Sequence, residues 1–437
     1  MIYPTRAGIV AAAVGAPVAL LVATVLPHVW YAGLAWPLAV LALSAVDALT
    51  GPPPGAASAR VGLPRSASVG ATIDVAIGID FAGTSPGAVE VAFATDALIA
   101  PQDDARIRIE IAGGTGSAVA PVVAARRGVT RIDALWLRWK GSLGLVWKQR
   151  HIAFDASTRI LPDVRPVHER GAQVFQRHAL QGLIAQVDRG DGADFDSLVE
   201  FRPGMDRRAI DWKQSARHLG LRAKEYRSEC NNQIVFAIDA GRQMSEPVAG
   251  LPRIDRAVAA MLLAAWVALK LGDRVALHAF DSRPRIASGL ISGARGFAEL
   301  QRLAADIDYS QDETNYPFAL ATLARTLSRR SMIVLFTEFT DLTSAEFMVR
   351  AAARLVEKHL LMVVVLRDAE LEAIGAARPE TAADVTRAVT AAALLRDRLL
   401  VLTRLRHLGV HVIESEHDRV GDRLVSGYID LKQRNLL

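Results

Sequence analysis

The sequence predicts a multidomain protein: a transmembrane helical hairpin, a small β-sandwich, and then an α/β domain with a mostly parallel sheet. Three observations predict it. Two uncharged apolar runs open the chain, apolar and polar residues alternate through residues 60–161, and strand and helix patterns alternate after residue 229. The 437 residues are enough for two or three domains, each large enough to bury its own core.

The amino end carries two long uncharged runs, residues 7–26 and 29–46, separated by a gap that leaves room only for a tight turn. Each run approaches the roughly 20 apolar residues that cross a bilayer. A signal peptide would have a shorter apolar region and no second run. Arg6 precedes the first run, and Arg60 and Arg65 follow the second, so the positive-inside tendency places both outer ends in the cytoplasm. We therefore expect a protein of the inner (cytoplasmic) membrane with its soluble domains in the cytoplasm.

A linker rich in Pro and Gly, residues 51–58, separates the hairpin from a region with period two. Apolar and polar side chains alternate, between Gly-rich breaks, in residues 72–80, 89–93, 107–111 and 135–139. This alternation indicates half-buried strands, and about seven short strands would form a small β-sandwich. Its exposed residues show no catalytic grouping, so we interpret it as a spacer or contact module.

Beyond residue 229 the pattern alternates between apolar strands and amphipathic helices. The expected strands are residues 233–239, 274–280, 332–336, 360–366 and 410–413, and the expected helices are residues 253–271, 297–305, 318–327, 345–358 and 384–407. Strands flanked by helices imply a mostly parallel sheet covered on both faces. Ligands of such sheets lie beyond the carboxyl ends of the strands. Those ends are residues 239–243 and 337–341, with the loop 312–315 before a helix.

Four regions follow from these patterns: residues 1–51 as two transmembrane helices, 52–165 as the β-sandwich, 166–228 as a connecting motif segment, and 229–437 as the α/β domain. Lys and Arg number 51 against 46 for Asp and Glu, without a long basic run, so nucleic acid is not an expected partner. The single Cys230 excludes an intramolecular disulfide and a multi-Cys zinc site within one chain. The sequence shows no recognisable Ser-His-Asp or Cys-His set and no Gly-rich phosphate loop, so we do not expect an enzyme.

The strand ends resemble those of a von Willebrand factor A domain, a Rossmann-like α/β fold whose metal site draws on an Asp-x-Ser-x-Ser loop, a Thr and an Asp. Beyond the hairpin the chain resembles the bacterial family called domain of unknown function fifty-eight. The matching stretches are residues 126–128, 141–145, 195–204, 208–213, 216–217 and 238–242. The resemblance implies a membrane-tethered adaptor or scaffold that presents its A-type domain to a cytosolic AAA+ ATPase of the MoxR type or to a client complex. Envelope assembly, complex assembly or stress response is the implied setting.

The same resemblance implies a degenerate metal-ion-dependent adhesion site, with Asp239, Thr314 and Glu338 as its remaining ligands. Gly241 and Gln243 replace both serines of the motif, and Glu338 replaces the third-loop Asp. Mg²⁺ takes an octahedron of oxygens, so three ligands are few for it. We expect either no cofactor or Mg²⁺. Without an ion, Asp239 and Thr314 would hold the loops by hydrogen bonds, or Arg242 would lie between Asp239 and Glu338 and neutralise them as a metal would.

Residues 202–217 form a dense polar segment just before the α/β domain. It places charges of alternating sign around Trp212, and the family often has Asp where this chain has Met205. Two interpretations stay open: a salt-bridged clasp between the β-domain and the α/β domain, or a partner-docking surface with Trp212 and arginines as hot spots.

The expected partner-binding residues are therefore Asp239, Arg242, Thr314 and Glu338 at the strand ends, and Arg208, Asp211, Trp212, Lys213 and Arg217 in the polar segment. The alternative function is a hydrolase that uses Asp239, Glu338 and Asp341 on an unidentified substrate.

Overall fold

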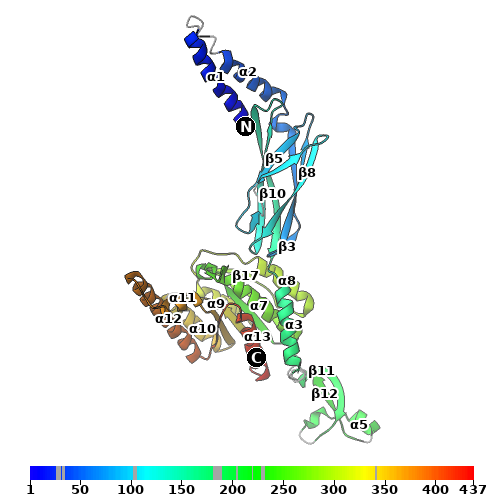
Figure 1. The fold of residues 1–437 in the computed structure, drawn as a ribbon. Coiled ribbons are helices and arrows are strands. Elements are labelled where there is room, and N and C mark those ends of the chain that lie inside the picture. The colour runs from blue at the N-terminus through cyan, green and yellow to red at the C-terminus, as the bar shows by residue number, and fades with distance from the viewer. Residues whose placement is uncertain are drawn as a thin grey trace. The chain divides into compact units, whose positions relative to one another are not determined.

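The computed structural model describes residues 1–25, 31, 35–101, 106–180, 189–202, 205–218, 220–227, 232–339 and 342–437. These residues form two compact units, Met1–Leu161 and Pro162–Leu437. Figure 1 shows the first unit with its two N-terminal helices and β-sheets, and the second with helices around a sheet. The predicted hairpin and the predicted β-domain thus belong to one unit.

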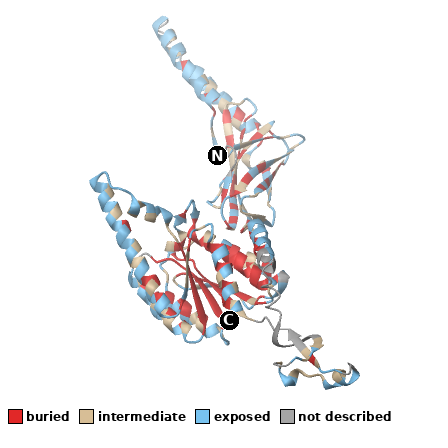
Figure 2. Cartoon of the chain, turned by 60° about the horizontal axis from the view of Figure 1, so that its bottom comes forward, coloured by how far each residue is buried: buried red, intermediate tan, exposed pale blue. Residues whose placement is uncertain are grey.

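Two apolar helices open the first unit, α1 (Arg6–Val25) and α2 (Ala35–Thr50). The stretches Arg6–Val25 and Ala35–Ala56 are long and apolar enough to cross a membrane, judged by length and composition. Most of their side chains are exposed, as Figure 2 shows, and these include Leu20, Leu21, Leu38 and Leu41. Apolar side chains exposed along a whole helix suggest membrane anchoring, because soluble proteins rarely expose large contiguous apolar surfaces.

The rest of the first unit consists of two sheets around one hydrophobic core. One sheet has the order β1-β10-β9-β5-β7 with β3 beside β10, and the other has the order β2-β4-β8-β6. The strands are β1 (Ile2–Pro4), β2 (Ala57–Gly62), β3 (Ser66–Ser68), β4 (Thr72–Phe81), β5 (Ala88–Phe93), β6 (Ile99–Pro101), β7 (Arg106–Glu110), β8 (Thr115–Ala124), β9 (Gly128–Lys140) and β10 (Val146–Leu161), and η2 (Pro54–Ala56) precedes β2. Every second side chain of β4 is buried, and the core draws on both sheets, for example on Ile77 and Leu137. Apolar and polar residues alternate in the sequence because successive side chains of a strand point alternately into this core and away from it.

The turn between β9 and β10 holds the end of α2. Asp47 of α2 is fully buried, and its carboxylate accepts hydrogen bonds from the backbone N–H groups of Leu143 at 2.6 Å, Leu145 at 2.8 Å and Val146 at 3.0 Å. A Cβ atom at Gly141 would lie 2.4 Å from Asp47 Oδ1, so glycine is needed for this close approach. One of the family-like stretches, residues 141–145, therefore anchors the second apolar helix.

The second unit contains a six-stranded sheet of order β17-β16-β13-β18-β19-β20. Its strands are β13 (Gln233–Asp239), β16 (Arg274–Phe280), β17 (Pro284–Ala287), β18 (Met332–Phe336), β19 (Leu360–Leu366) and β20 (His411–Ser415). All neighbours from β16 to β20 are parallel, and β17 is an antiparallel edge strand. Antiparallel pairing prevails in the other described sheets, so the fold as a whole is mixed.

Helices cover both faces of this sheet. The helices of this unit, some of which pack on other helices rather than on the sheet, are α3 (Arg165–Leu180), α6 (Arg242–Ser245), α7 (Arg253–Lys270), α8 (Gly293–Ala305), α9 (Tyr316–Thr326), α10 (Leu342–Val356), α11 (Ala369–Ala376), α12 (Ala382–His407) and α13 (Val420–Gln433). The short strands β14 (Pro247–Val248) and β15 (Leu251–Pro252) pair with each other. Alternate residues of β13 belong to different cores: Phe236 packs with α7 and α13, whereas Val235 packs with α9 and α10. The continuous apolar runs in the sequence arise because these strands are buried on both faces.

The predicted connecting segment contains helix α3 and a separate antiparallel pair, β11 (Arg189–Glu200) and β12 (Arg222–Arg227). Between these strands lie η3 (Arg207–Ala209) and α5 (Trp212–His218). We call residues 189–227 the arm. The dense polar segment of the sequence is the connection between its two strands.

Candidate functional site

Asp239, the last residue of β13, lies at the carboxyl edge of the sheet and is only 1% exposed. Its carboxylate accepts four hydrogen bonds: from Gly241 N at 2.9 Å and Thr314 Oγ1 at 2.6 Å on Oδ1, and from Thr337 Oγ1 at 2.7 Å and the Tyr316 hydroxyl at 3.0 Å on Oδ2. A carboxylate offers about four lone-pair sites. The Asp239 carboxylate is therefore fully occupied by groups of this chain.

Three loops bring these donors together. Thr314 lies just before α9, whose N-cap residue Asn315 accepts from Phe318 N at 3.2 Å. Tyr316 is the first residue of α9, and Thr337 follows β18, the neighbour of β13. The parallel sheet places the ends of β13 and β18 side by side, which is why residues almost one hundred positions apart meet.

Gly241 makes the contact between Thr314 and Asp239 possible. Its backbone angles, φ −66° and ψ 173°, suit any residue, so conformational freedom is not the reason for glycine here. A Cβ atom at this position would lie 2.0 Å from Thr314 Oγ1. The serine that an adhesion-site loop has at this position therefore does not fit while Thr314 bonds Asp239 directly.

The burial of Asp239 and Tyr316 shifts the pKa values of both groups upward. Burial raises the pKa of Asp239, while the hydrogen bonds from Thr314, Gly241, Thr337 and Tyr316 act against the rise. Burial, followed by the nearby Asp239 charge, raises the pKa of Tyr316 well above its ordinary value. Tyr316 is therefore a permanent proton donor to its neighbours rather than an acid that gives up its proton.

Glu338 lies at the same edge of the sheet, but two arginines hold its carboxylate. Arg253 Nη1 is 3.0 Å from Oε2 and Arg398 Nη1 is 3.1 Å from Oε1, and both arginine side chains are at most 10% exposed. We call Arg253 and Arg398 the arginine pair. Arg253 also bonds Asp368 at 2.6 Å, and Arg398 lies 3.4 Å from Glu414. Burial raises the pKa of Glu338, and the positive charges of Arg398 and Arg253 oppose that rise.

The hypothesis that Arg242 lies between Asp239 and Glu338 is wrong. Arg242 Nη2 instead pairs with Glu313 Oε1 at 2.6 Å, and the two side chains are 56% and 62% exposed. The backbone explains the difference, because Arg242 begins α6 and its N–H group bonds Asp312 O at 2.9 Å. The arginine pair, from α7 and α12, occupies the position beside Glu338.

The three residues expected to hold Mg²⁺ do not fit an ion in this arrangement. The Asp239 oxygens accept four hydrogen bonds, Thr314 donates its hydroxyl to Asp239, and the arginine pair holds Glu338. Within the part of the chain that the structure describes, no group of three or more His, Cys, Asp or Glu residues could hold a metal ion. Asp341, the third residue of the alternative hydrolase set, lies outside the described residues.

The polar segment in the arm is built on local contacts. Asp206 accepts from Arg208 N at 2.9 Å and caps η3, and Asp211 accepts from Gln214 N at 3.1 Å at the start of α5. The Gln214 amide lowers the pKa of Asp211, and Lys224, 3.4 Å away, acts in the same direction against some desolvation. Sequence reasoning assigned Asp211 to partner binding and missed this capping role, although an Asp just before a helix is the usual signal for it.

The exposed face of the arm carries cations around an aromatic ring. Trp212 is 69% exposed, and Arg208, Lys213 and Arg217 are also exposed. An exposed Trp and three exposed cations on one short segment are typical of a docking surface, and the clasp stays open as the other interpretation.

Comparison with known proteins shows what this chain is similar to. Residues 197–400 match the family model described as "Protein of unknown function DUF58". The match begins in the arm, includes the carboxyl edge of the sheet, and supports the resemblance to that family. No curated protein matches the chain. A crystal structure of native alpha-2-macroglobulin from Escherichia coli, spanning domain MG7 to the C-terminus, is 19% identical with a TM-score of 0.21. The match covers 24% of this chain and 16% of that chain, and so low a similarity does not show a shared fold.

Proposed function

We propose that this protein is a membrane-tethered adaptor. In this proposal α1 and α2 hold it in the inner membrane, and residues after Leu49 lie in the cytoplasm. The two sheets of the first unit are a β-sandwich, and the second unit is a von Willebrand factor A-type domain. This domain binds a cytosolic MoxR-type AAA+ ATPase or a client complex. The support is the order of the parts: two apolar helices, then a two-sheet core, then a largely parallel sheet with Asp239 and Thr314 at its carboxyl edge.

One observation favours an adaptor over a hydrolase. The two described carboxylates of the hydrolase set, Asp239 and Glu338, are 1% and 3% exposed, and groups of this chain occupy both of them. A general base must reach a proton of its substrate, directly or through one water. Neither carboxylate has a free oxygen with which to do this. The carboxyl edge is therefore better suited to contact than to catalysis.

The same edge exposes the ion pair of Arg242 and Glu313 to solvent. Arginine is enriched among interface residues that dominate binding energy, since its planar group makes several directed hydrogen bonds. Asp239 bonds Gly241 N and Thr314 Oγ1 and so joins the two loops that carry this ion pair, whereas the arginine pair holds Glu338. We assign Arg242 to contact with the partner and Asp239, Thr314 and Glu338 to positioning.

Co-purification from membranes tests the proposal. A tagged full-length chain should recover a AAA+ ATPase in stoichiometric amount, quantified by mass spectrometry. Arg242→Ala should weaken capture roughly 30-fold, because truncating a central arginine anchor costs about 2 kcal/mol. Its thermal unfolding should change little, because exposed ion pairs contribute about 0–1 kcal/mol. Arg350→Ala is the matched control: Arg350 pairs with Glu346 at 3.8 Å and both are exposed. Absence of any ATPase from the wild-type eluate would refute the ATPase partner, and absence of any stoichiometric protein would refute the adaptor.

The arm is the second candidate contact, and Trp212→Ala tests it separately. Because Trp212 is largely exposed, the substitution should leave unfolding unchanged. Loss of capture in this variant, with normal capture by Arg242→Ala, would move the docking surface from the sheet edge to the arm. A clear loss of stability would instead support the clasp interpretation.

A further inference from the structure

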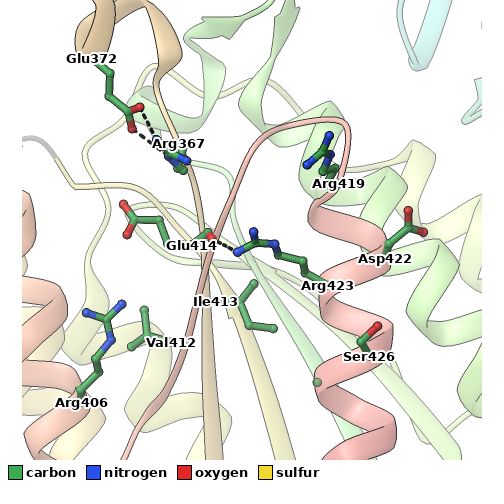
Figure 3. Close-up of a pocket in the computed structure, with 11 residues that line it drawn as sticks. Arg367, Glu372, Arg406, Val412, Ile413, Glu414, Arg419, Asp422, Arg423 and Ser426 are labelled. Atoms are coloured by element: carbon green, nitrogen blue, oxygen red, sulfur yellow. Dashed lines mark hydrogen bonds and ion pairs between the residues drawn. The ribbon is translucent and has the colours of Figure 1, made fainter. Parts of the chain in front are cut away.

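A groove runs along the outer edge of β20, the last strand of the six-stranded sheet. Its volume is about 880 Å³, and α12 and α13 contribute side chains to its walls (Figure 3). In the described sheet, β20 pairs with β19 on one side only. An unpaired strand edge presents backbone donors and acceptors that another strand can use.

The register shows which backbone groups face the groove. Ser415 O accepts from Arg367 N, beyond the end of β19, at 2.8 Å. Successive residues of a strand direct their N–H and C=O groups to opposite edges, so those of Val412 and Glu414 face the groove. The position of Arg423 agrees with this, because its Nη1 donates to Glu414 O at 3.1 Å. The edge therefore offers a repeat of donors and acceptors one strand long.

The charged side chains that line the groove favour a ligand with negative charge. Four arginines and three carboxylates line it. Glu372 is held by Arg367 at 2.5 Å, and Glu414 lies 3.4 Å from Arg398. Among the described residues, Arg406 and Arg423 form no ion pair with a carboxylate, and of the three lining carboxylates only Asp422 is also without one, so the unpaired charges of the lining sum to one positive charge.

These two arginines lie on opposite faces of the strand. Arg406 comes from α12, beside Val412, which packs into the core under α10 and α12. Arg423 comes from α13, beside Ile413, which packs into the other core (Figure 3). Side chains of an added strand would alternate between these faces in the same way.

We propose that this groove binds an extended acidic segment of a partner protein, which adds to β20 as a further strand. Backbone hydrogen bonds to the N–H and C=O groups of Val412 and to the N–H group of Glu414 give the affinity, as in other cases of strand addition, and Arg423 turns from Glu414 O to the ligand. Carboxylates of the segment bind Arg406 on one face and Arg423 on the other. Because neighbouring side chains of a strand point to opposite faces, the segment has acidic residues at adjacent positions. The proposal stands independently of the ATPase partner proposed above.

Isothermal titration calorimetry on the full-length protein in detergent tests this with two synthetic peptides of equal composition. One is acetyl-Thr-Val-Glu-Glu-Val-Thr-amide, with adjacent acids, and the other is acetyl-Thr-Glu-Val-Glu-Val-Thr-amide, with both acids on one face. We expect the first to bind at least fivefold more tightly than the second. Its affinity should fall with added salt, because exposed charges are screened. Equal affinities, or no binding of either peptide, would overturn the proposal.

Three variants locate the binding. Arg406→Glu should weaken binding of the adjacent-acid peptide at least tenfold, whereas Arg396→Glu makes the same charge change on α12, outside the groove, and should have no effect. Val412→Pro removes an outward N–H group while the ladder to β19 uses the alternate residues, so the fold should persist and binding should be lost. Unchanged binding by Val412→Pro would exclude strand addition. Dimers in the wild type that this variant abolishes, without peptide binding, would show that a second copy occupies the edge.

Discussion

Replacing Gly241 with alanine tests whether direct hydrogen bonds lock Asp239. The Gly241 backbone angles suit alanine, so the substitution adds no backbone strain. Its Cβ atom would lie 2.0 Å from Thr314 Oγ1, and the threonine must move. That movement breaks the 2.6 Å hydrogen bond from Thr314 to the Asp239 carboxylate.

The expected magnitudes follow from these contacts. A hydrogen bond to a charged group contributes about 1.5–3 kcal/mol, so Thr314→Ala should lower the free energy of unfolding by about 2 kcal/mol. Gly241→Ala loses the same bond and adds overpacking, for a loss of about 3 kcal/mol. In the double variant the new Cβ meets Asp239 Oδ1 at 3.1 Å and Asp312 O at 3.3 Å, contacts that need only small shifts. The double variant should therefore lose only about 2 kcal/mol, well short of the sum.

Urea unfolding of the full-length protein in detergent measures these losses. Hydrogen exchange of peptides from β13 and β18 measures the stability of the second unit separately from that of the first, because both strands belong to the second unit. Gly375→Ala is the control, because its nearest contact would be 3.6 Å away, and it should be neutral or stabilising. Additive losses in the double variant would refute the reasoning. Stabilisation of the wild-type protein by micromolar Mg²⁺, lost when Asp239 is replaced, would also refute the reasoning, because an ion stabilises the folded state only by binding to it.

Three further predictions concern other parts of the chain. Arg253→Met should lower the free energy of unfolding by about 3–5 kcal/mol, because it strips a partner from the buried Glu338; a loss under about 1 kcal/mol in urea unfolding would contradict this. Burial lowers the pKa of His278, so stability is fully present above the unfolded pKa of about 6.5 and is lost as pH falls toward the folded pKa. His278→Leu should remove this loss when urea midpoints at about pH 7.5 and about pH 5.5 are compared; an identical pH response of both proteins would count against it. A periplasm-active reporter fused after Leu437 should stay silent in cells, and strong activity there would overturn the cytoplasmic placement and the ATPase partner with it.

The strands of the second unit could be predicted from the sequence because they are buried on both faces. The expected residues 233–239, 274–280, 332–336 and 360–366 coincide with β13, β16, β18 and β19. Continuous apolar runs between polar loops mark such strands clearly. Parallel pairing of these strands then brings their carboxyl ends to one edge, which is how the neighbourhood of Asp239 and Thr314 was predictable.

Helix α13 shows what was missed although a signal existed. Val420, Leu424, Tyr428 and Leu431 are buried on one face of it, at the three- and four-residue spacing of an amphipathic helix. Charged residues between them obscure the pattern. The helix matters because it forms one wall of the groove at β20, and that groove was therefore not predictable either.

The arginine pair could not be predicted from the sequence. Arg253 begins α7 and Arg398 lies far along α12, where an arginine normally indicates a solvated helix face. Only the three-dimensional arrangement brings these helices to Glu338. Tyr316 and Thr337 were missed for a similar reason, since neither residue type signals a buried carboxylate beyond its own loop.

Groups of this chain stabilise both buried carboxylates at the carboxyl edge of the sheet, and two of the three expected departures from an adhesion-site motif, Gly241 and Glu338, agree with this. Gly241 in place of serine lets Thr314 reach Asp239, so hydrogen bonds stabilise this carboxylate. Glu338 in place of aspartate is one methylene longer and reaches the arginine pair, so guanidinium groups stabilise the second carboxylate. In a metal site a divalent cation would stabilise both, because buried charges need a partner. Here the partners belong to the chain itself, so under the proposed function the surface that carries Arg242 and Glu313 forms when the protein folds.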